Sequence, residues 1–118
     1  EERFAVEWLV PVLEEIADRD AARGVWDVYR FRIGGESFWV EVADGDVTVR
    51  AGDPPREPDL SVELDIGTFM ELGFGTLDPM EAVAQGRATA TGDLTKAQTA
   101  LDVLSPARIF SKVSAAAL

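Results

Sequence analysis

Three short runs of alternating polar and apolar residues constrain the fold of this chain more than any other feature. They span residues 28–33, 37–43 and 47–51, and such alternation is typical of a half-buried strand. Gly-Gly-Glu at 34–36 and Asp-Gly-Asp at 44–46 separate the runs, and these residues favour tight turns between antiparallel strands. The pattern therefore predicts a three-stranded antiparallel meander.

Two more strands are predicted after the meander. The proline-rich segment 53–58 cannot pair in a sheet and is predicted to be a surface loop. Residues 60–65 alternate again, and residues 87–91 are predicted to form a fifth strand in spite of their small side chains.

Apolar spacing and capping residues predict helices before and after the meander in the sequence. Before it lies an amphipathic segment over 4–17, in which Pro11 marks a kink or a second helical piece, and Gly24 ends the helical region. After it we predict a helix over 66–73 capped by Asp65, a helix that starts at Pro79 after Asp78, and a long helix over 94–104 that Asp93 caps and Pro106 stops.

Pleat alternation divides the strand residues between two faces of the sheet. The apolar face holds Tyr29, Phe31, Ile33, Phe38, Val40, Val42, Val47, Val49, Leu60, Val62 and Leu64, and the polar face holds Arg30, Arg32, Trp39, Glu41, Thr48, Arg50, Ser61, Glu63, Arg87, Thr89 and Thr91. We predict an α+β fold, with a five-stranded, mainly antiparallel sheet and helices on one face that enclose an apolar pocket.

Composition excludes several classes of function. The formal net charge of −11 opposes attraction to phosphate backbones, so direct nucleic-acid binding is not expected. The longest apolar run, residues 8–13, is far shorter than the roughly 18 residues of a membrane span.

We expect a single domain over residues 1–118 in the cytoplasm, with a core over 26–104, an N-terminal helical segment over 1–23 and a tail over 106–118. Because the chain begins at Glu1 without methionine, we expect it to be a fragment or domain of a longer protein.

The residue types present offer little for catalysis. The chain has no histidine and no cysteine, which removes the usual nucleophile–histidine pairs and histidine-ligated metals. Asp44 and Asp46 lack the other donors of a calcium loop and are expected to form a hairpin turn. We therefore predict no catalytic residue, no metal site and no cofactor.

The segment between the last two strands is rich in large apolar side chains. Phe69, Met70, Leu72, Phe74, Leu77, Met80 and Val83 lie in two short helices interrupted by Gly73 and Gly75. These side chains could form an ordinary core, or they could line a deformable apolar pocket. Their spacing does not separate the two possibilities.

The order of these segments resembles the sterol carrier protein type 2 family. The resemblance lies in PDLSVELD, then FMELGFGTLDPMEAVAQG, then RATATGDLTKAQTAL, and covers roughly residues 26–104; its matching positions are Asp65, Gly73, Pro79, Ala82, Gly86, Gly92, Asp93, Leu94, Leu101 and Leu104. It implies a sheet covered by helices around an apolar tunnel that binds fatty acyl chains, sterols or similar lipids without chemical change. On this basis the expected ligand-binding residues are Phe31, Val40, Phe69, Met70, Phe74, Leu77, Met80, Val83, Ala97, Leu101 and Leu104.

Two other functions stay open. Residues 11–24 are weakly similar to the helix that closes some winged-helix domains, so the chain could be a ligand-sensing or dimerisation domain of a larger regulator. It could also be an accessory domain of an enzyme.

Trp39 is unusual because tryptophan on a polar sheet face suggests partial cover by another element or by a second copy of the chain. We expect Trp39→Ser to leave the fold intact and to weaken any homodimer. Analytical ultracentrifugation tests this, and equal masses for both proteins would remove the proposed interface.

Overall fold

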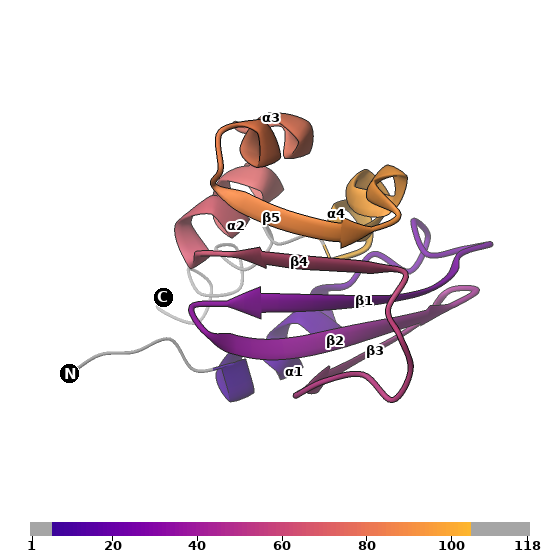
Figure 1. The fold of residues 1–118 in the computed structure, drawn as a ribbon. Helices are drawn as coiled ribbons and strands as arrows, with labels where there is room; N and C mark the ends of the chain where they lie inside the picture. Colours follow the sequence, from indigo (N-terminus) through magenta and orange to yellow (C-terminus); the bar gives the residue numbers. More distant parts are fainter. Residues whose placement is uncertain (1–5, 105–118) are drawn as a thin grey trace, which may run out of the picture.

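The computed structural model describes residues 6–104, which form one five-stranded sheet with all helices on one face (Figure 1). The strands are β1 (Trp26–Ile33), β2 (Glu36–Ala43), β3 (Asp46–Ala51), β4 (Leu60–Leu64) and β5 (Ala88–Gly92), in the order β3-β2-β1-β4-β5. The helices are α1 (Val6–Ile16), α2 (Ile66–Phe74), α3 (Pro79–Ala84), the 3₁₀ turn η1 (Leu94–Lys96) and α4 (Ala97–Leu104). The α+β fold with a mainly antiparallel sheet is confirmed.

The meander has the predicted turns. Gly34 and Gly35 between β1 and β2 have φ of 61° and 87°, and Asp44 and Gly45 between β2 and β3 have φ of 46° and 93°. Positive φ at both central residues is the mark of a two-residue turn whose twist matches the strands. The Asp44–Gly45 pair is thus a hairpin turn, and the Asp44 carboxylate accepts a hydrogen bond from the Gly24 N–H.

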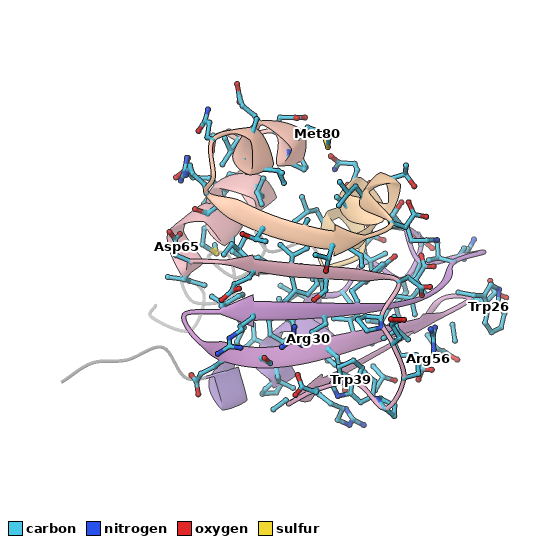
Figure 2. The ribbon with its side chains drawn as sticks, in the orientation of Figure 1. Trp26, Arg30, Trp39, Arg56, Asp65 and Met80 are labelled. Carbon is cyan, nitrogen blue, oxygen red and sulfur yellow. The ribbon has the colours of Figure 1, made fainter. Side chains whose placement is uncertain are left out.

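The two faces of the sheet differ as predicted, with one exception. Figure 2 shows Arg30 and Trp39 on the face that carries no helix, and Arg32 pairs across the strands with Glu63 at 3.8 Å. Arg87 is the exception. It lies in the bend before β5 and its guanidinium binds Glu71 of α2, because outside the strand its side chain does not follow the pleat.

Helix α1 covers β2 and β3 and differs from its prediction in two ways. The helix is continuous through Pro11, whose side chain is exposed, and it ends at Ile16 instead of Gly24. The helix stops because the Asp18 carboxylate accepts hydrogen bonds from the N–H groups of the next turn. The Glu14 carboxylate accepts a hydrogen bond of 2.8 Å from the Val49 N–H, so α1 occupies a donor of an edge strand.

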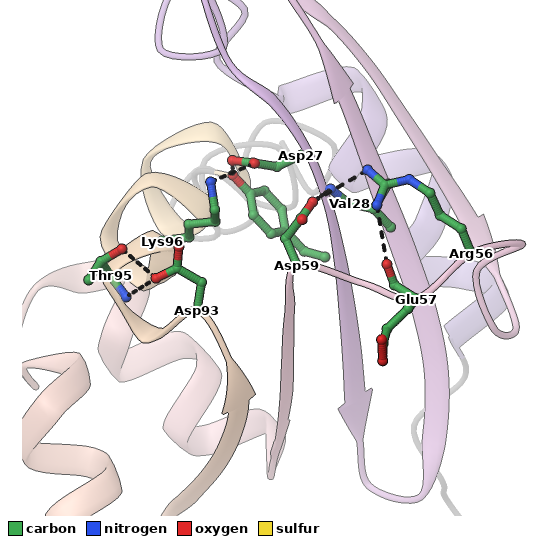
Figure 3. A network of polar contacts seen from close by, with 9 residues as sticks. Asp27, Val28, Arg56, Glu57, Asp59, Asp93, Thr95 and Lys96 are labelled. Atoms are coloured by element: carbon green, nitrogen blue, oxygen red, sulfur yellow. Dashed lines mark hydrogen bonds and ion pairs between the residues drawn. The ribbon is translucent and has the colours of Figure 1, made fainter.

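Strand β4 pairs in parallel with β1, and β5 pairs with the other side of β4 and forms the edge of the sheet. Asp59 secures this arrangement. Its carboxylate accepts a hydrogen bond from the Val28 N–H (Figure 3). Its N–H donates to the Val28 carbonyl and its own carbonyl accepts from the Asp93 N–H, and all three bonds are 2.8 Å long. One residue therefore joins the starts of β1 and β4 to the end of β5.

The predicted caps of the later helices are present. Asp65 accepts from the Thr68 N–H at 2.6 Å, which lowers the pKa of that carboxyl, and Asp78 accepts from the N–H groups of Met80 and Glu81. The segment predicted as one long helix over 94–104 is instead η1 followed by α4. The Asp93 carboxylate binds the N–H and hydroxyl of Thr95 and tightens this first turn. Pro106 lies outside the described residues.

Gly92 allows the close approach of β5 to Asp59. A Cβ at Gly92 would lie 2.5 Å from the Asp59 carbonyl oxygen, and the φ of Gly92 is +94°. Gly52 has a similar φ of +97°, but a Cβ there would meet nothing within 4 Å.

The variants Gly92→Ala and Gly52→Ala should both incur a backbone strain of about 1–3 kcal/mol. Gly92→Ala should lose roughly 1–3 kcal/mol more through overlap. Urea unfolding of both variants measures the difference, and equal losses would show that the approach of Asp59 is unimportant.

Candidate binding cavity

An apolar cavity lies between the β4–β5 half of the sheet and the helices above it. Its walls come from β1, β4, β5, α2, α3, η1 and α4, and every lining residue is Phe, Leu, Val, Met, Pro or Ala. The lining contains no ionisable side chain. The cavity therefore offers no side chain for acid–base or nucleophilic chemistry.

Small residues leave this half of the molecule hollow. The side chains of β5 that share the face of Leu64 and Val62 are those of Ala88 and Ala90, and α4 contributes Ala97 and Ala100 from the opposite wall. The other half is filled by larger side chains. There Phe38 and Val40 of β2 are fully buried, as are Leu9 and Leu13 of α1.

Two aromatic rings form one end of the cavity. Phe31 stacks on Phe38 with ring centroids 5.3 Å apart, and it meets Phe69 edge to face at 6.1 Å. Phe31 and Phe69 line the cavity, whereas Phe38 belongs to the filled half. The Phe31 ring thus separates the solid core from the hollow part.

The cavity opens to the surface between α3 and η1. A shallow groove there is lined by Asp78, Pro79, Met80, Leu94, Thr95, Ala97 and Gln98. Met80, on the side of α3 toward α4 (Figure 2), is 57% exposed, and Leu94 is 36% exposed. Since both also line the cavity, they mark its mouth.

A partly buried ion pair fixes η1 to the sheet. The Lys96 ammonium lies 2.8 Å from one carboxylate oxygen of Asp27, and the other oxygen accepts from the Tyr29 hydroxyl at 2.8 Å (Figure 3). The hydrogen bond with Asp27 raises the pKa of Lys96, and burial, followed by the hydrogen bond to Asp27, raises the pKa of Tyr29 above its usual range. The contact holds the wall formed by Leu94 and Ala97 in place.

At the opposite end, α2 is tied to the start of β5. Arg87 donates two hydrogen bonds to the Glu71 carboxylate, at 2.5 and 3.3 Å, and a third to the Thr68 hydroxyl. The hydrogen bond from Arg87 lowers the pKa of Glu71. These contacts keep α2 against the edge of the sheet.

The structure places six of the eleven expected ligand-binding residues on the cavity wall: Phe31, Phe69, Met80, Val83, Ala97 and Leu101. Val40, Leu77 and Leu104 belong to the solid core, Met70 packs against that core, and Phe74 is 49% exposed at the end of α2. Sequence reasoning missed Leu60, Val62, Leu64, Leu72, Pro79, Ala88, Ala90, Leu94 and Ala100. The alternating alanines of β5 were the available signal, because small residues facing a helix layer leave space.

Neither described tryptophan side chain reaches the cavity. Trp26 is 69% exposed at the start of β1, and Trp39 is half-buried on the outer face between Arg30 and Arg50 in the strand register. The sequence predicts that Trp26 lies near the sheet end and that its emission reports ligand binding. Trp26 does lie at the start of β1, but it is not among the residues that line the cavity, and the change in emission stays a prediction.

Residues 6–104 show neither a metal site nor a membrane-spanning helix. No group of three His, Cys, Asp or Glu side chains is placed to hold a metal ion there. No helix in that part of the chain has the length and apolarity to cross a bilayer.

The fold and the cavity define an α+β domain with an enclosed apolar space. The model of the SCP-2 sterol transfer family matches residues 10–105. The chain belongs to this family.

Known proteins with similar sequence or structure support the same fold. Hydroxysteroid dehydrogenase-like protein 2 of Xenopus tropicalis is 24% identical over 85 residues, which cover 70% of this chain and 20% of that protein. The sec-alkylsulfatase Pisa1 from Pseudomonas sp. matches with a TM-score of 0.74 and 20% identity, over 85% of this chain and 16% of the other. Palmitated SCP2L2 from Aedes aegypti matches with a TM-score of 0.57 and 22% identity, over 84% and 89%. This chain thus spans about a fifth of the Xenopus protein.

The Lys96–Asp27 contact should contribute measurably to stability. Lys96→Met leaves the Asp27 carboxylate buried without its cation and should cost roughly 1–3 kcal/mol. Arg23→Met removes an exposed ion pair with Asp20 and should cost less than about 1 kcal/mol. Thermal and urea unfolding compare the two variants.

The same contact has a predicted pH dependence. The pKa of Lys96 is raised in the folded state. The contact therefore contributes fully to the free energy of unfolding below the ordinary lysine pKa of about 10.4, and this contribution is lost as the pH rises through the pKa that Lys96 has in the folded protein. The difference in stability between the wild type and Lys96→Met should therefore shrink at strongly alkaline pH. A difference that stays constant would contradict this account.

Proposed function

We propose that this chain is a non-catalytic lipid-binding or carrier domain that holds an acyl chain, a sterol or a similar apolar molecule. The observation that carries the proposal is the cavity, whose lining is entirely apolar and which opens at Met80 and Leu94. Each 100 Å² of apolar ligand surface removed from water would contribute about 2.5 kcal/mol before the costs of binding. No cofactor is required.

The cavity must widen to accept such a molecule. Its volume of about 40 Å³ is far below the roughly 300–1,000 Å³ of small-molecule sites. Helix α3 is the wall that we expect to move, since it has six residues and Ala82 is its one buried side chain. By contrast, α4 buries Ala100, Leu101, Val103 and Leu104 and continues from the anchored η1.

The similar proteins support this assignment in two ways. SCP2L2 of Aedes aegypti has been solved in a palmitated form, which favours an acyl ligand for this fold. The sequence match to a dehydrogenase-like protein of much greater length favours a second candidate, in which this lipid-binding domain serves an enzyme as an accessory part. Either role would be consistent with a carrier in the cytoplasm.

The first test is direct binding. We expect the chain to bind hexadecanol, hexadecanoic acid or cholesterol in native mass spectrometry, and to be stabilised by about 2.7 kcal/mol when the free ligand exceeds Kd by a hundredfold. Unchanged mass spectra and unchanged thermal stability with all three ligands would contradict the proposed function.

The second test fills the cavity. Ala97→Phe places a ring between α4 and β5, where the cavity of about 40 Å³ must widen to accept it. The variant should therefore fold with a loss of about 1–3 kcal/mol and lose lipid binding. Ala84→Phe is the matched control, because Ala84 is exposed at the end of α3 and does not line the cavity. Strong destabilisation by Ala97→Phe with unaltered lipid binding would defeat the assignment of this cavity.

A further inference from the structure

We infer that the mouth of this cavity selects lipids with an uncharged, hydroxyl-bearing head over lipids with an anionic head such as a free carboxylate. The inference rests on the proposed function and names the class of ligand that the same site would accept. It follows from where the head of a bound lipid must lie and from which side chains surround that place.

A polar head cannot lie inside the cavity. The lining has no polar side chain, and burying a polar group without a hydrogen-bond partner costs several kcal/mol on the steepest scales. The apolar body would therefore fill the cavity and the head would emerge at the mouth. The groove at the mouth offers Asp78, Thr95 and Gln98 as its polar side chains.

The charges fixed at this mouth are negative. The Asp78 carboxylate is held at the start of α3, where it accepts from Met80 N–H at 3.0 Å and Glu81 N–H at 3.3 Å. Asp93 is held beside the groove by the hydroxyl and N–H of Thr95, and these hydrogen bonds lower the pKa of its carboxyl. An anionic head would thus meet the like charge of these carboxylates at the mouth.

No basic side chain of residues 6–104 is available as a counterion at the mouth. Each of the eight lysine and arginine side chains in this range already makes an ion pair or a hydrogen bond. Lys96, adjacent to the groove residue Thr95, points its ammonium to Asp27 at the sheet. Arg87 is held by Glu71. The first N–H groups of α3 are already bound by Asp78, so they cannot receive an anion either.

A hydroxyl head finds partners in the same place. The amide nitrogen of Gln98 donates to Asp102 at 2.9 Å, so Gln98 can offer its carbonyl oxygen as an acceptor. Asp78 can accept a further hydrogen bond, because a carboxylate has about four acceptor positions. A lipid alcohol would donate to either group, whereas an ionised carboxylate has no proton to donate.

The experiment compares dodecanol with dodecanoate at pH 7.5 by isothermal titration calorimetry of the chain and two variants. Asp78→Asn removes the charge at the mouth and keeps a good helix cap. Asp46→Asn makes the same change in net charge at an exposed position on β3, the opposite edge of the sheet. The lower affinity of any carboxylate for an apolar site is common to all three proteins and cancels in the comparison.

We expect the wild type to bind dodecanol more tightly, and Asp78→Asn to strengthen dodecanoate binding relative to dodecanol by about two- to fivefold, as one charge at about 8 Å would do in a medium between protein and water. Asp46→Asn should leave the ratio unchanged. Raising the salt concentration should reduce the effect of Asp78→Asn.

Three results would overturn the inference. Tighter binding of dodecanoate by the wild type would do so, as would an equal shift in both variants, which would assign selectivity to net charge and not to the mouth. An unchanged ratio in Asp78→Asn would show that the head lies elsewhere. Failure of both probes to bind any of the three proteins would instead contradict the proposed function, and the inferred selectivity would be lost with it.

Discussion

The hydrogen bonds of Asp59 are the constraint on which the rest of this structure depends. Two of them pair the start of β4 with Val28 of β1, and the third receives the Asp93 N–H at the end of β5. Without this junction the chain after the proline-rich loop has no fixed register against the meander. Gly92 is required at the same point because a side chain there would collide with the Asp59 carbonyl. The order β3-β2-β1-β4-β5 and the position of β5 as an edge follow from it.

The placement of β5 at the edge makes one half of the molecule hollow. A strand carrying Ala88 and Ala90 on its inner face would create a defect in the middle of a sheet, since packing voids cost about 24 cal/mol per Å³. At the edge, α3 and α4 can bridge over the small residues without closing on them. Large side chains such as Phe38 and Leu13 fill the other half. The meander and α1 supply much of the core, and β4, β5 and the later helices supply most of the cavity wall.

Local signals in the sequence were sufficient for the elements of the fold. Alternation in the meander, positive-φ turns at Gly35 and Gly45, and the caps Asp65 and Asp78 each depend on residues close together in the chain. The same signals failed where a distant contact decides the outcome. Arg87 lies in the bend before β5, where its side chain does not follow the pleat, and its guanidinium binds Glu71 of α2.

The cavity was harder to predict because it is a property of side-chain volumes that meet in space. Val40 and Phe31 are both buried apolar residues on the inner face of neighbouring strands, yet Phe31 lines the hollow and Val40 lies in the solid core. No periodicity distinguishes them, since the difference lies in which helix covers each strand. What the sequence does carry is the small size of Ala88 and Ala90 at period two. A strand with a small inner face can be stable only if its neighbours fill the gap or if something else enters it, and here the neighbouring walls include Ala97 and Ala100 of α4. Small residues on both sides of one gap are therefore the sequence pattern that points to a cavity.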